Sequence, residues 1–176
     1  MDLCEQIYNF FNSPFFVIWG GISIIVTIYI AIRTFILIFK GVIPVWYRLG
    51  KGLSKRKIAV FAENQEYSEL KSLLTDSGLF SEKNIIRIDK NSIKKAKGFT
   101  LLLVHHFSFK NNLEEIINLK MDEAALIIYA PQSEGMIDGG MIQKINDHRN
   151  SIIVNMRGRL LNDILTSMMT TGYGKR

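Results

Sequence analysis

The sequence predicts an α/β protein in which one N-terminal transmembrane helix precedes a domain built on a five-stranded parallel sheet. Two observations support this fold class. Residues 14–32 form a run of nineteen residues without a formal charge. After residue 56, five short apolar runs alternate with amphipathic stretches, and the runs are apolar throughout rather than at every second position. Such strands are typical of a parallel sheet that is covered on both faces.

The uncharged run is long enough to cross a bilayer. At about 1.5 Å per residue it spans roughly 28 Å, close to a hydrocarbon core of about 30 Å. A signal peptide is disfavoured because the chain starts with acidic residues (Asp2 and Glu5) and no small-residue cleavage pattern follows. We therefore expect a transmembrane helix over 14–40, preceded by a short extracytoplasmic lead over 1–13.

Positive charge is concentrated beside this helix. Residues 1–56 hold six Lys/Arg and two acidic residues, whereas residues 57–176 hold sixteen and fourteen. Lys and Arg beside a span mark its cytoplasmic side. We expect a single-pass protein of the cell inner membrane with its N-terminus outside, a basic juxtamembrane neck over 41–56, and a cytoplasmic domain over 57–176. The neck is either a topology signal alone or also a site for anionic lipid headgroups.

The same distribution argues against duplex nucleic acid as a partner, because the excess of positive charge does not lie on the domain. The chain has one cysteine, Cys4, so it has no internal disulfide.

Arg33 is the first charge that interrupts the apolar run. Either it snorkels to the cytoplasmic interface, or it faces a water-filled lumen between several copies of the helix. Gly20, Ser23 and Thr27 recur at helical spacing, and small residues of this kind allow close packing of membrane helices. We therefore treat these four residues as candidates for pore lining or helix packing.

The domain over 57–176 has the size and alternation of a flavodoxin-like, doubly wound fold. Leucines at helical spacing before Gly78 mark its first helix, and Pro131 ends its fourth strand. The predicted strands are 57–62, 84–88, 99–105, 124–130 and 151–155, and the predicted helical segments are 65–76, 92–96, 112–119, 139–147 and 159–170.

In an open parallel sheet, ligands bind beyond the carboxyl ends of the strands. This rule selects a polar and mixed set that suits an uncharged heterocycle plus phosphate. The candidate ligand-binding residues are Glu63, Asn64, His106, Ser108, Gln132, Asn155, Arg157 and Arg159.

The two arginines of this set flank Gly158 where a helix is expected to begin. A helix N-terminus and arginine side chains both favour phosphate, although one arginine could instead pair with Asp163. His105 and His106 are adjacent, so in a strand they point to opposite faces. We expect one to be packed and the other, taken as His106, to lie at the rim, where it could contact a base or a phosphate.

No catalytic motif is complete. The chain lacks G-x-S-x-G, and its glycine-rich segment 135–140 lacks the Lys-Ser/Thr of a P-loop. No Cys/His cluster has metal-ligand spacing, and Glu63 is a lone carboxylate beyond a strand. We therefore expect no catalytic residue, no metal and no resident cofactor.

The runs KIAVFAENQEYSELKSLL and NMRGRLLNDILTSM, together with the single span and basic neck, resemble prokaryotic antiviral membrane effectors. In these proteins an N-terminal membrane helix is fused to a TIR-like or CARF-like nucleotide-sensing domain, and the Hailong-type channel effectors have a similar architecture. The resemblance implies a homo-oligomer, with four subunits expected, whose spans form an ion path. It also implies an oligonucleotide second messenger made by a partner nucleotidyltransferase or CRISPR complex.

From this resemblance we expect a nucleotide-gated ion channel in antiphage defence. The first alternative is a membrane-anchored TIR-like enzyme that consumes NAD. In catalytic TIR domains a glutamate carries this reaction, and Glu134 and Glu63 are the candidates here. The second alternative is a non-catalytic anchored scaffold.

Overall fold

The computed structural model describes residues 2–171, apart from the side chains at positions 48, 51, 52, 54 and 55. The chain forms two compact units, Met1–Trp46 and Tyr47–Arg176. The first contains helix α1 (Leu3–Phe11) and most of helix α2 (Pro14–Lys55), and the second contains the α/β domain.

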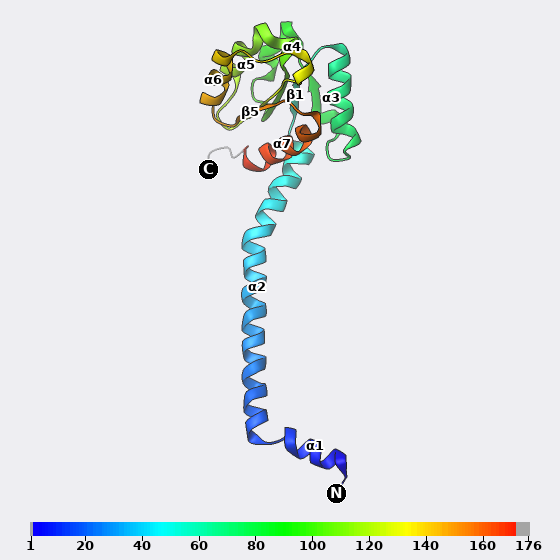
Figure 1. Cartoon of the computed structure of the whole chain (residues 1–176), viewed down its shortest axis with the longest axis vertical. Helices are drawn as coiled ribbons and strands as arrows, with labels where there is room; N and C mark the ends of the chain where they lie inside the picture. The colour runs from blue at the N-terminus through cyan, green and yellow to red at the C-terminus, as the bar shows by residue number, and fades with distance from the viewer. Residues whose placement is uncertain (1, 172–176) are drawn as a thin grey trace. The chain divides into compact units, whose positions relative to one another are not determined.

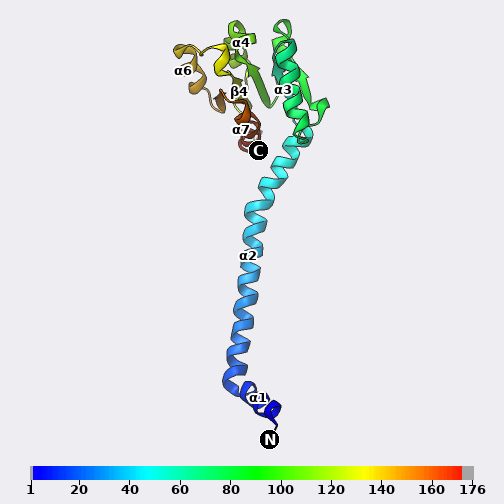
Figure 2. The ribbon, with the colours of Figure 1, turned by 45° about the vertical axis from the view of Figure 1, so that its right-hand side comes forward.

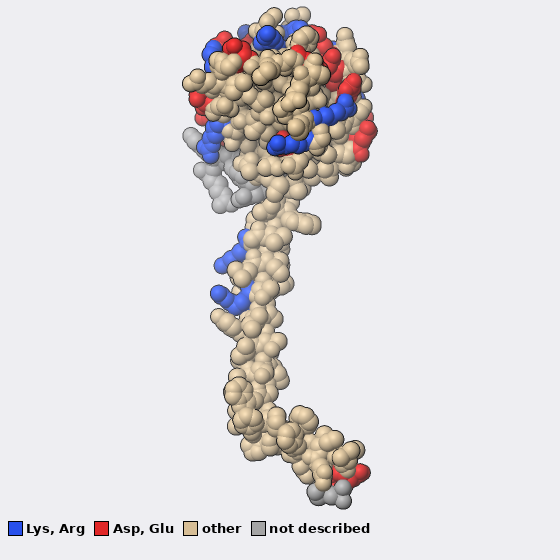
Figure 3. Space-filling model, in the orientation of Figure 1, with Lys and Arg blue, Asp and Glu red and all other residues tan. Residues whose placement is uncertain are grey.

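Helix α2 is one continuous helix of 42 residues. Its segment Pro14–Tyr47 is long and apolar enough to cross a membrane, and none of its most apolar stretch is buried within the structure. Figure 3 shows its surface as almost entirely uncharged, with a few basic side chains on one side of the helix. One candidate membrane span is therefore present, as predicted.

The segment expected to be a neck is helical as far as Lys55. Pro44 lies inside the helix, where a proline removes one backbone hydrogen bond. The helix nevertheless continues on both sides of Pro44, and a side chain at Gly41 or Gly50 would meet open space. The basic side chains at 48, 51 and 55, on which the prediction of a basic neck partly rests, lie outside the described residues.

The α/β domain contains a five-stranded, all-parallel sheet, which confirms the predicted fold class. The strand order is β2-β1-β3-β4-β5, the order of the flavodoxin-like fold. In register, Ala59 of β1 lies beside Ile86 of β2 and Leu102 of β3. The strands are β1 (Ile58–Phe61), β2 (Ile85–Arg87), β3 (Leu101–His105), β4 (Ala125–Tyr129) and β5 (Ser151–Val154).

Helices cover both faces of the sheet (Figure 1), and Figure 2 shows α3 and α6 on opposite sides of it. One face packs on α3 (Asn64–Asp76) and α7 (Arg157–Thr170) through Leu74, Leu160 and Ile164, which are fully buried. The other face packs on the 3-10 helix η2 and on α5 and α6. Their bounds are Lys90–Ala96, Leu113–Leu119 and Gly139–Asp147, and four shorter helices are η1 (Glu82–Asn84), α4 (His106–Phe109), η3 (Lys110–Asn112) and η4 (Gln132–Glu134).

Two local features differ from the expectation. Residues 106–109, expected to be loop, form α4, which turns Phe109 inward so that its ring meets the edge of Phe61 at 5.6 Å between ring centroids. Helix α7 begins at Arg157, two residues earlier than predicted. Gly158 lies in the first turn of α7, where the helix tolerates its flexibility better than in the interior.

Arg56 joins the start of the α/β domain to its last helix. Its two terminal guanidinium nitrogens donate hydrogen bonds to the carbonyl oxygens of Met168 and Thr171, both at 2.8 Å. A cation at the C-terminal end of a helix satisfies carbonyls that have no partner within the helix. Leu53, in the last turn of α2, also packs against the core beneath α7. The end of α2 is thereby attached to α7.

Candidate functional site

A pocket lies beyond the carboxyl ends of β3 and β4, with walls from α3 and α7. We call it the Arg157 pocket. Its volume is about 340 Å³. Doubly wound folds bind their ligands beyond the carboxyl ends of the strands. It is lined by Gln65, Glu66, Glu69, Leu70, His105, Tyr129, Pro131, Ser133, Glu134 and Arg157.

An ion pair joins the two helical walls of this pocket. Arg157, the first residue of α7, places its Nη1 atom 2.6 Å from Oε2 of Glu69 on α3. This hydrogen bond lowers the pKa of Glu69 below its ordinary value, and a weaker bond from Gln65 acts in the same direction. Both side chains are about half exposed, so solvent and ligands can reach the pair.

His105 forms the floor of the pocket. It is the last residue of β3 and is 98% shielded from solvent, since its exposed fraction is 2%. Its Nε2 atom lies 3.0 Å from Oε2 of Glu134, and its Nδ1 atom lies 2.8 Å from Oγ of Ser108. With both ring nitrogens engaged, the imidazole is fixed in orientation and holds the Glu134 carboxylate at the pocket wall.

The Ser108–His105–Glu134 chain contains the residue types of a hydrolase triad, but its geometry favours a positioning role. Ser108 lies three residues after His105, in the short helix α4, and it does not line the pocket. A nucleophile must reach the substrate, and here the hydroxyl group of Ser108 is hydrogen-bonded to Nδ1 of His105 instead. We therefore infer that these hydrogen bonds serve to hold Glu134 in position.

Tyr129, the last residue of β4, completes the pocket wall. Its ring lies 5.9 Å from that of His105, measured between centroids. Partial burial raises the pKa of the Tyr129 hydroxyl, so this group stays protonated and can donate a hydrogen bond at neutral pH. The phenol therefore offers a ligand an aromatic surface and one polar group.

The charges of the pocket restrict its ligand. Glu66, Glu69 and Glu134 supply three carboxylates, against the single guanidinium of Arg157. A polyphosphate would meet strong like-charge repulsion there. The arrangement suits a molecule with several hydrogen-bond donors for the carboxylates and one anionic group for Arg157.

Of the eight residues predicted to bind ligand, all within the described range, Arg157 is the one that lines this pocket. Ser108 contacts it indirectly through His105. Gln132 begins η4 on the loop that carries Glu134, and Asn155 is exposed just before α7. Arg159 is exposed and lies 3.9 Å from Asp163, the acidic partner that the sequence offered as the alternative to phosphate.

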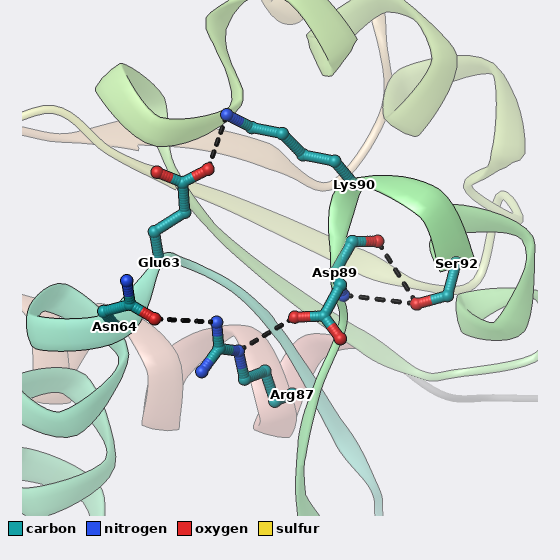
Figure 4. Close-up of polar contacts among 6 residues, drawn as sticks. All are labelled: Glu63, Asn64, Arg87, Asp89, Lys90 and Ser92. Atoms are coloured by element: carbon teal, nitrogen blue, oxygen red, sulfur yellow. Dashed lines mark hydrogen bonds and ion pairs between the residues drawn. The ribbon is translucent and has the colours of Figure 1, made fainter.

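Glu63 and Asn64 belong to a different polar cluster, at the carboxyl ends of β1 and β2 (Figure 4). Lys90 contacts the carboxylate of Glu63 at 2.5 Å. Arg87 donates to Oδ1 of Asn64 at 3.3 Å and pairs with Asp89 at 3.0 Å. Asn64 begins α3 with a positive φ of 23°, and its bond from Arg87 supports this unusual backbone. The charges of this cluster satisfy one another.

His106 lies beside a second cavity of about 330 Å³, which Lys110, Asp138 and Lys144 also line. The side chain is 7% exposed. Burial lowers the pKa of His106, and the nearby charge of Lys110 lowers it further. Both histidines are thus largely buried, and each lines a different cavity: His105 the Arg157 pocket and His106 the second one.

The sequence contains a signal that identifies His105. Leu101 and Leu103 of β3 pack on the face that carries α3 and α7. Strand alternation places residue 105 on that same face, and Arg157 starts one of the two helices there. Glu69 has no comparable signal, because its partner Arg157 lies 88 residues away in the chain.

Among the described residues, no group of three or more His, Cys, Asp or Glu side chains has a geometry that could hold a metal ion. No protein-family model matches the chain, and no curated protein matches it.

Proposed function

We propose that this protein is a membrane-anchored effector whose α/β domain binds a nucleotide signal in the Arg157 pocket. The observation that carries the proposal is the location of this pocket. It lies beyond the carboxyl ends of β3 and β4, where ligands of doubly wound folds bind, with an arginine at the start of a helix on its wall. The domain continues from an apolar helix long enough to span a membrane.

The chemistry of the pocket suits one nucleotide unit. Arg157 and the N-terminal N–H groups of α7 would take a phosphate, which would displace Glu69 from the guanidinium. The carboxylates of Glu66 and Glu134 would accept hydrogen bonds from ribose hydroxyls or a base amine. A volume of about 340 Å³ lies at the lower end of the range for ligand pockets. An oligonucleotide would therefore insert one unit and leave the others outside.

The proposed output is the membrane helix. Arg157 stands at one end of α7, and at the other end the carbonyls of Met168 and Thr171 bind Arg56, which follows α2 directly. A ligand that replaces Glu69 on Arg157 acts on α7 and, through it, on the end of α2. It shifts the state of the span only as far as its affinity differs between the two states.

In this proposal the N-terminus lies outside the cell inner membrane, the domain is cytoplasmic, and several copies form an ion path in antiphage defence. The topology follows from the basic residues on the C-terminal side of the span. The signal would be an oligonucleotide from a partner nucleotidyltransferase or CRISPR complex, as the resemblance implies.

The binding test uses the full-length protein in mild detergent and a thermal-shift screen of mononucleotides and of linear and cyclic oligonucleotides. We expect at least one nucleotide to raise the melting temperature, and Arg157→Ala to abolish that rise. Arg149→Ala is the matched control, because Arg149 is an exposed arginine just before β5. It lies at the amino ends of the strands, away from the pocket. A rise that persists in Arg157→Ala would reject this pocket as the site.

The NAD-consuming alternative gains one specific observation. Glu134, a candidate for the catalytic glutamate, lines the pocket and is held there by His105, whereas Glu63 is engaged with Lys90 elsewhere. If the protein were this enzyme, incubation with NAD would consume the dinucleotide, and Glu134→Gln would stop the loss while Glu63→Gln would not. The scaffold alternative predicts a monomeric span and no small-molecule ligand.

A further inference from the structure

The apolar segment of α2 is longer than a bilayer can cover. Its 34 residues from Pro14 to Tyr47 extend about 51 Å, against a hydrocarbon core of roughly 30 Å. Tilt alone would have to reach about 54° to bury it, beyond the observed range of roughly 0–40°. About fourteen residues of this segment, most of them apolar, therefore need another cover.

The charges place this excess after Arg33. If the uncharged residues 14–32 fill the hydrocarbon, the segment 34–46 lies beyond it on the side of the α/β domain. The large apolar side chains of this segment are 36–74% exposed in the single chain. Apolar surface of this extent in contact with water favours association.

The segment has a heptad seam. Phe35, Ile38, Val42 and Val45 are spaced by three, four and three residues, which is the a/d spacing of a coiled coil. The seam continues into the span through Gly20, Ile24, Thr27 and Ala31, which fall on the same face. Thr27 donates its hydroxyl to the carbonyl of Ser23 at 2.8 Å, so it brings no unsatisfied donor into a helix interface.

The basic residues of α2 lie on the opposite face. Arg33 and Lys40 are seven residues apart and share one side of the helix, whereas the seam lies roughly 120–200° around the axis from Arg33. Basic side chains on the visible face of the helix project from one side only (Figure 3). The sequence of α2 contains no acidic residue, so this basic stripe suits anionic lipid headgroups rather than a neighbouring helix.

We propose that the seam formed by Phe35, Ile38, Val42 and Val45 packs against the same seam of other copies of this chain, as a parallel, in-register helical bundle. The partner is a second copy because every copy enters the membrane in the same orientation, which brings identical segments to the same depth. Arg33 and Lys40 face outward in this bundle. The proposal rests on the part of the proposed function in which several copies associate, and it does not depend on the Arg157 pocket.

Disulfide cross-linking of the full-length protein in phosphatidylethanolamine–phosphatidylglycerol vesicles tests the orientation. Cys4, the single cysteine, is first replaced by serine. Cysteines are then introduced one at a time at Ile38 and Val45 in the seam, and at Leu37 and Lys40 as matched controls on the outer face. A disulfide needs Cα atoms within about 7 Å. We therefore expect oxidation to join the seam variants at least about fivefold faster than the controls.

Faster cross-linking at Leu37→Cys and Lys40→Cys would place the basic stripe inside the bundle and overturn the proposal. Equal cross-linking rates at all four positions would overturn the proposal. So would rates that fall in proportion as the protein is diluted with lipid, because such rates indicate random collision of the helices. No nucleotide is added, and introducing Arg157→Ala into the seam variants should leave their rates unchanged. An experiment that rejects the Arg157 pocket as a ligand site therefore leaves the seam untouched, and one that rejects the seam leaves the pocket untouched.

Discussion

At the scale of single residues, the ion pair between Arg157 and Glu69 is the most informative contact of the pocket. The same guanidinium that would bind a phosphate is occupied by a carboxylate of the chain itself. In the proposed function a ligand would have to compete with Glu69, and its apparent affinity would be reduced according to how often the pair is closed. The internal carboxylate sets a threshold for the ligand.

Glu69→Gln should lower that threshold. Glutamine has nearly the same shape but lacks the charge that holds Arg157, and the substitution also makes the pocket less negative. We expect tighter nucleotide binding, by about three- to tenfold. Titration calorimetry on the full-length protein measures it, with Glu63→Gln as a control that removes a carboxylate outside the pocket without freeing Arg157. Weaker binding in Glu69→Gln would mean that Glu69 itself contacts the ligand.

His106 gives the domain a pH dependence. Burial holds its pKa below the ordinary value of 6.5 in the folded protein, so the unfolded chain binds more protons in the range below pH 6.5. The stability that depends on a neutral His106 is therefore fully present above about pH 6.5. It is lost as the pH falls through the lowered pKa of the folded state. We expect His106→Gln to lose less thermal stability between pH 7.5 and 5.5 than the wild type does. His148→Gln, which removes an exposed imidazole, is the control, and an equal effect of both substitutions would contradict the assignment.

At the scale of secondary structure, the strands could be predicted from the sequence and the site could not. All five strands lie within two residues of their predicted bounds, because apolar runs of this length have few other uses in an α/β chain. The site depends on contacts between distant elements. The rule that selects residues after each strand misses His105 and Tyr129, which are the last residues of their strands, and it misses Glu69, which lies a full turn inside α3.

The contact between Arg56 and α7 could not be predicted from the sequence for the same reason. In the sequence it reads as one more basic residue beside the span, whereas in the structure it binds two carbonyls at the end of α7. Local composition does not reveal a contact across 112 residues. The continuation of α2 through Pro44 was also missed, because a proline among glycines is more typical of a linker than of a helix.

Arg56→Met should destabilise the domain, because it leaves partly buried carbonyls without their charged donor. We expect a loss of about 1.5–3 kcal/mol in the free energy of unfolding, the usual range for hydrogen bonds to a charged group. Urea unfolding of the full-length protein in mild detergent measures it. Lys57→Met removes the neighbouring, exposed charge and should change stability by less than about 0.5 kcal/mol. Equal effects of the two substitutions would show that Arg56 contributes only charge.

At the scale of the whole molecule, the proposed bundle and the proposed nucleotide site would together make a channel that is closed at rest. With Phe35, Ile38, Val42 and Val45 turned toward the bundle axis, the path would be closed by apolar side chains, and narrow apolar constrictions exclude ions by dewetting. The basic stripe would then serve to hold the bundle at the lipid surface rather than to select ions.

This arrangement predicts that Val42→Ser raises the ion flux of reconstituted vesicles without any nucleotide, because a hydroxyl admits water to the axis. Leu37→Ser, on the outer face, is the matched control and should leave the basal flux unchanged. In the wild type, flux should require nucleotide. In Arg157→Ala, nucleotide should no longer raise the flux, because the path stays closed. Flux that is indifferent to every nucleotide tested and to Val42→Ser would reject the channel.

The bond between Arg56 and the end of α7 also fixes an order of events during synthesis. Arg56 leaves the ribosome early, but the carbonyl of Thr171 follows 115 residues later, a delay of roughly 6–23 s at about 5–20 residues per second. Throughout that interval α2 is complete while the helix that fastens it to the domain does not yet exist. If the apolar helix enters a membrane, it can therefore do so before the domain is complete. The bond from Arg56 can close the domain only after the whole apolar helix has been synthesised.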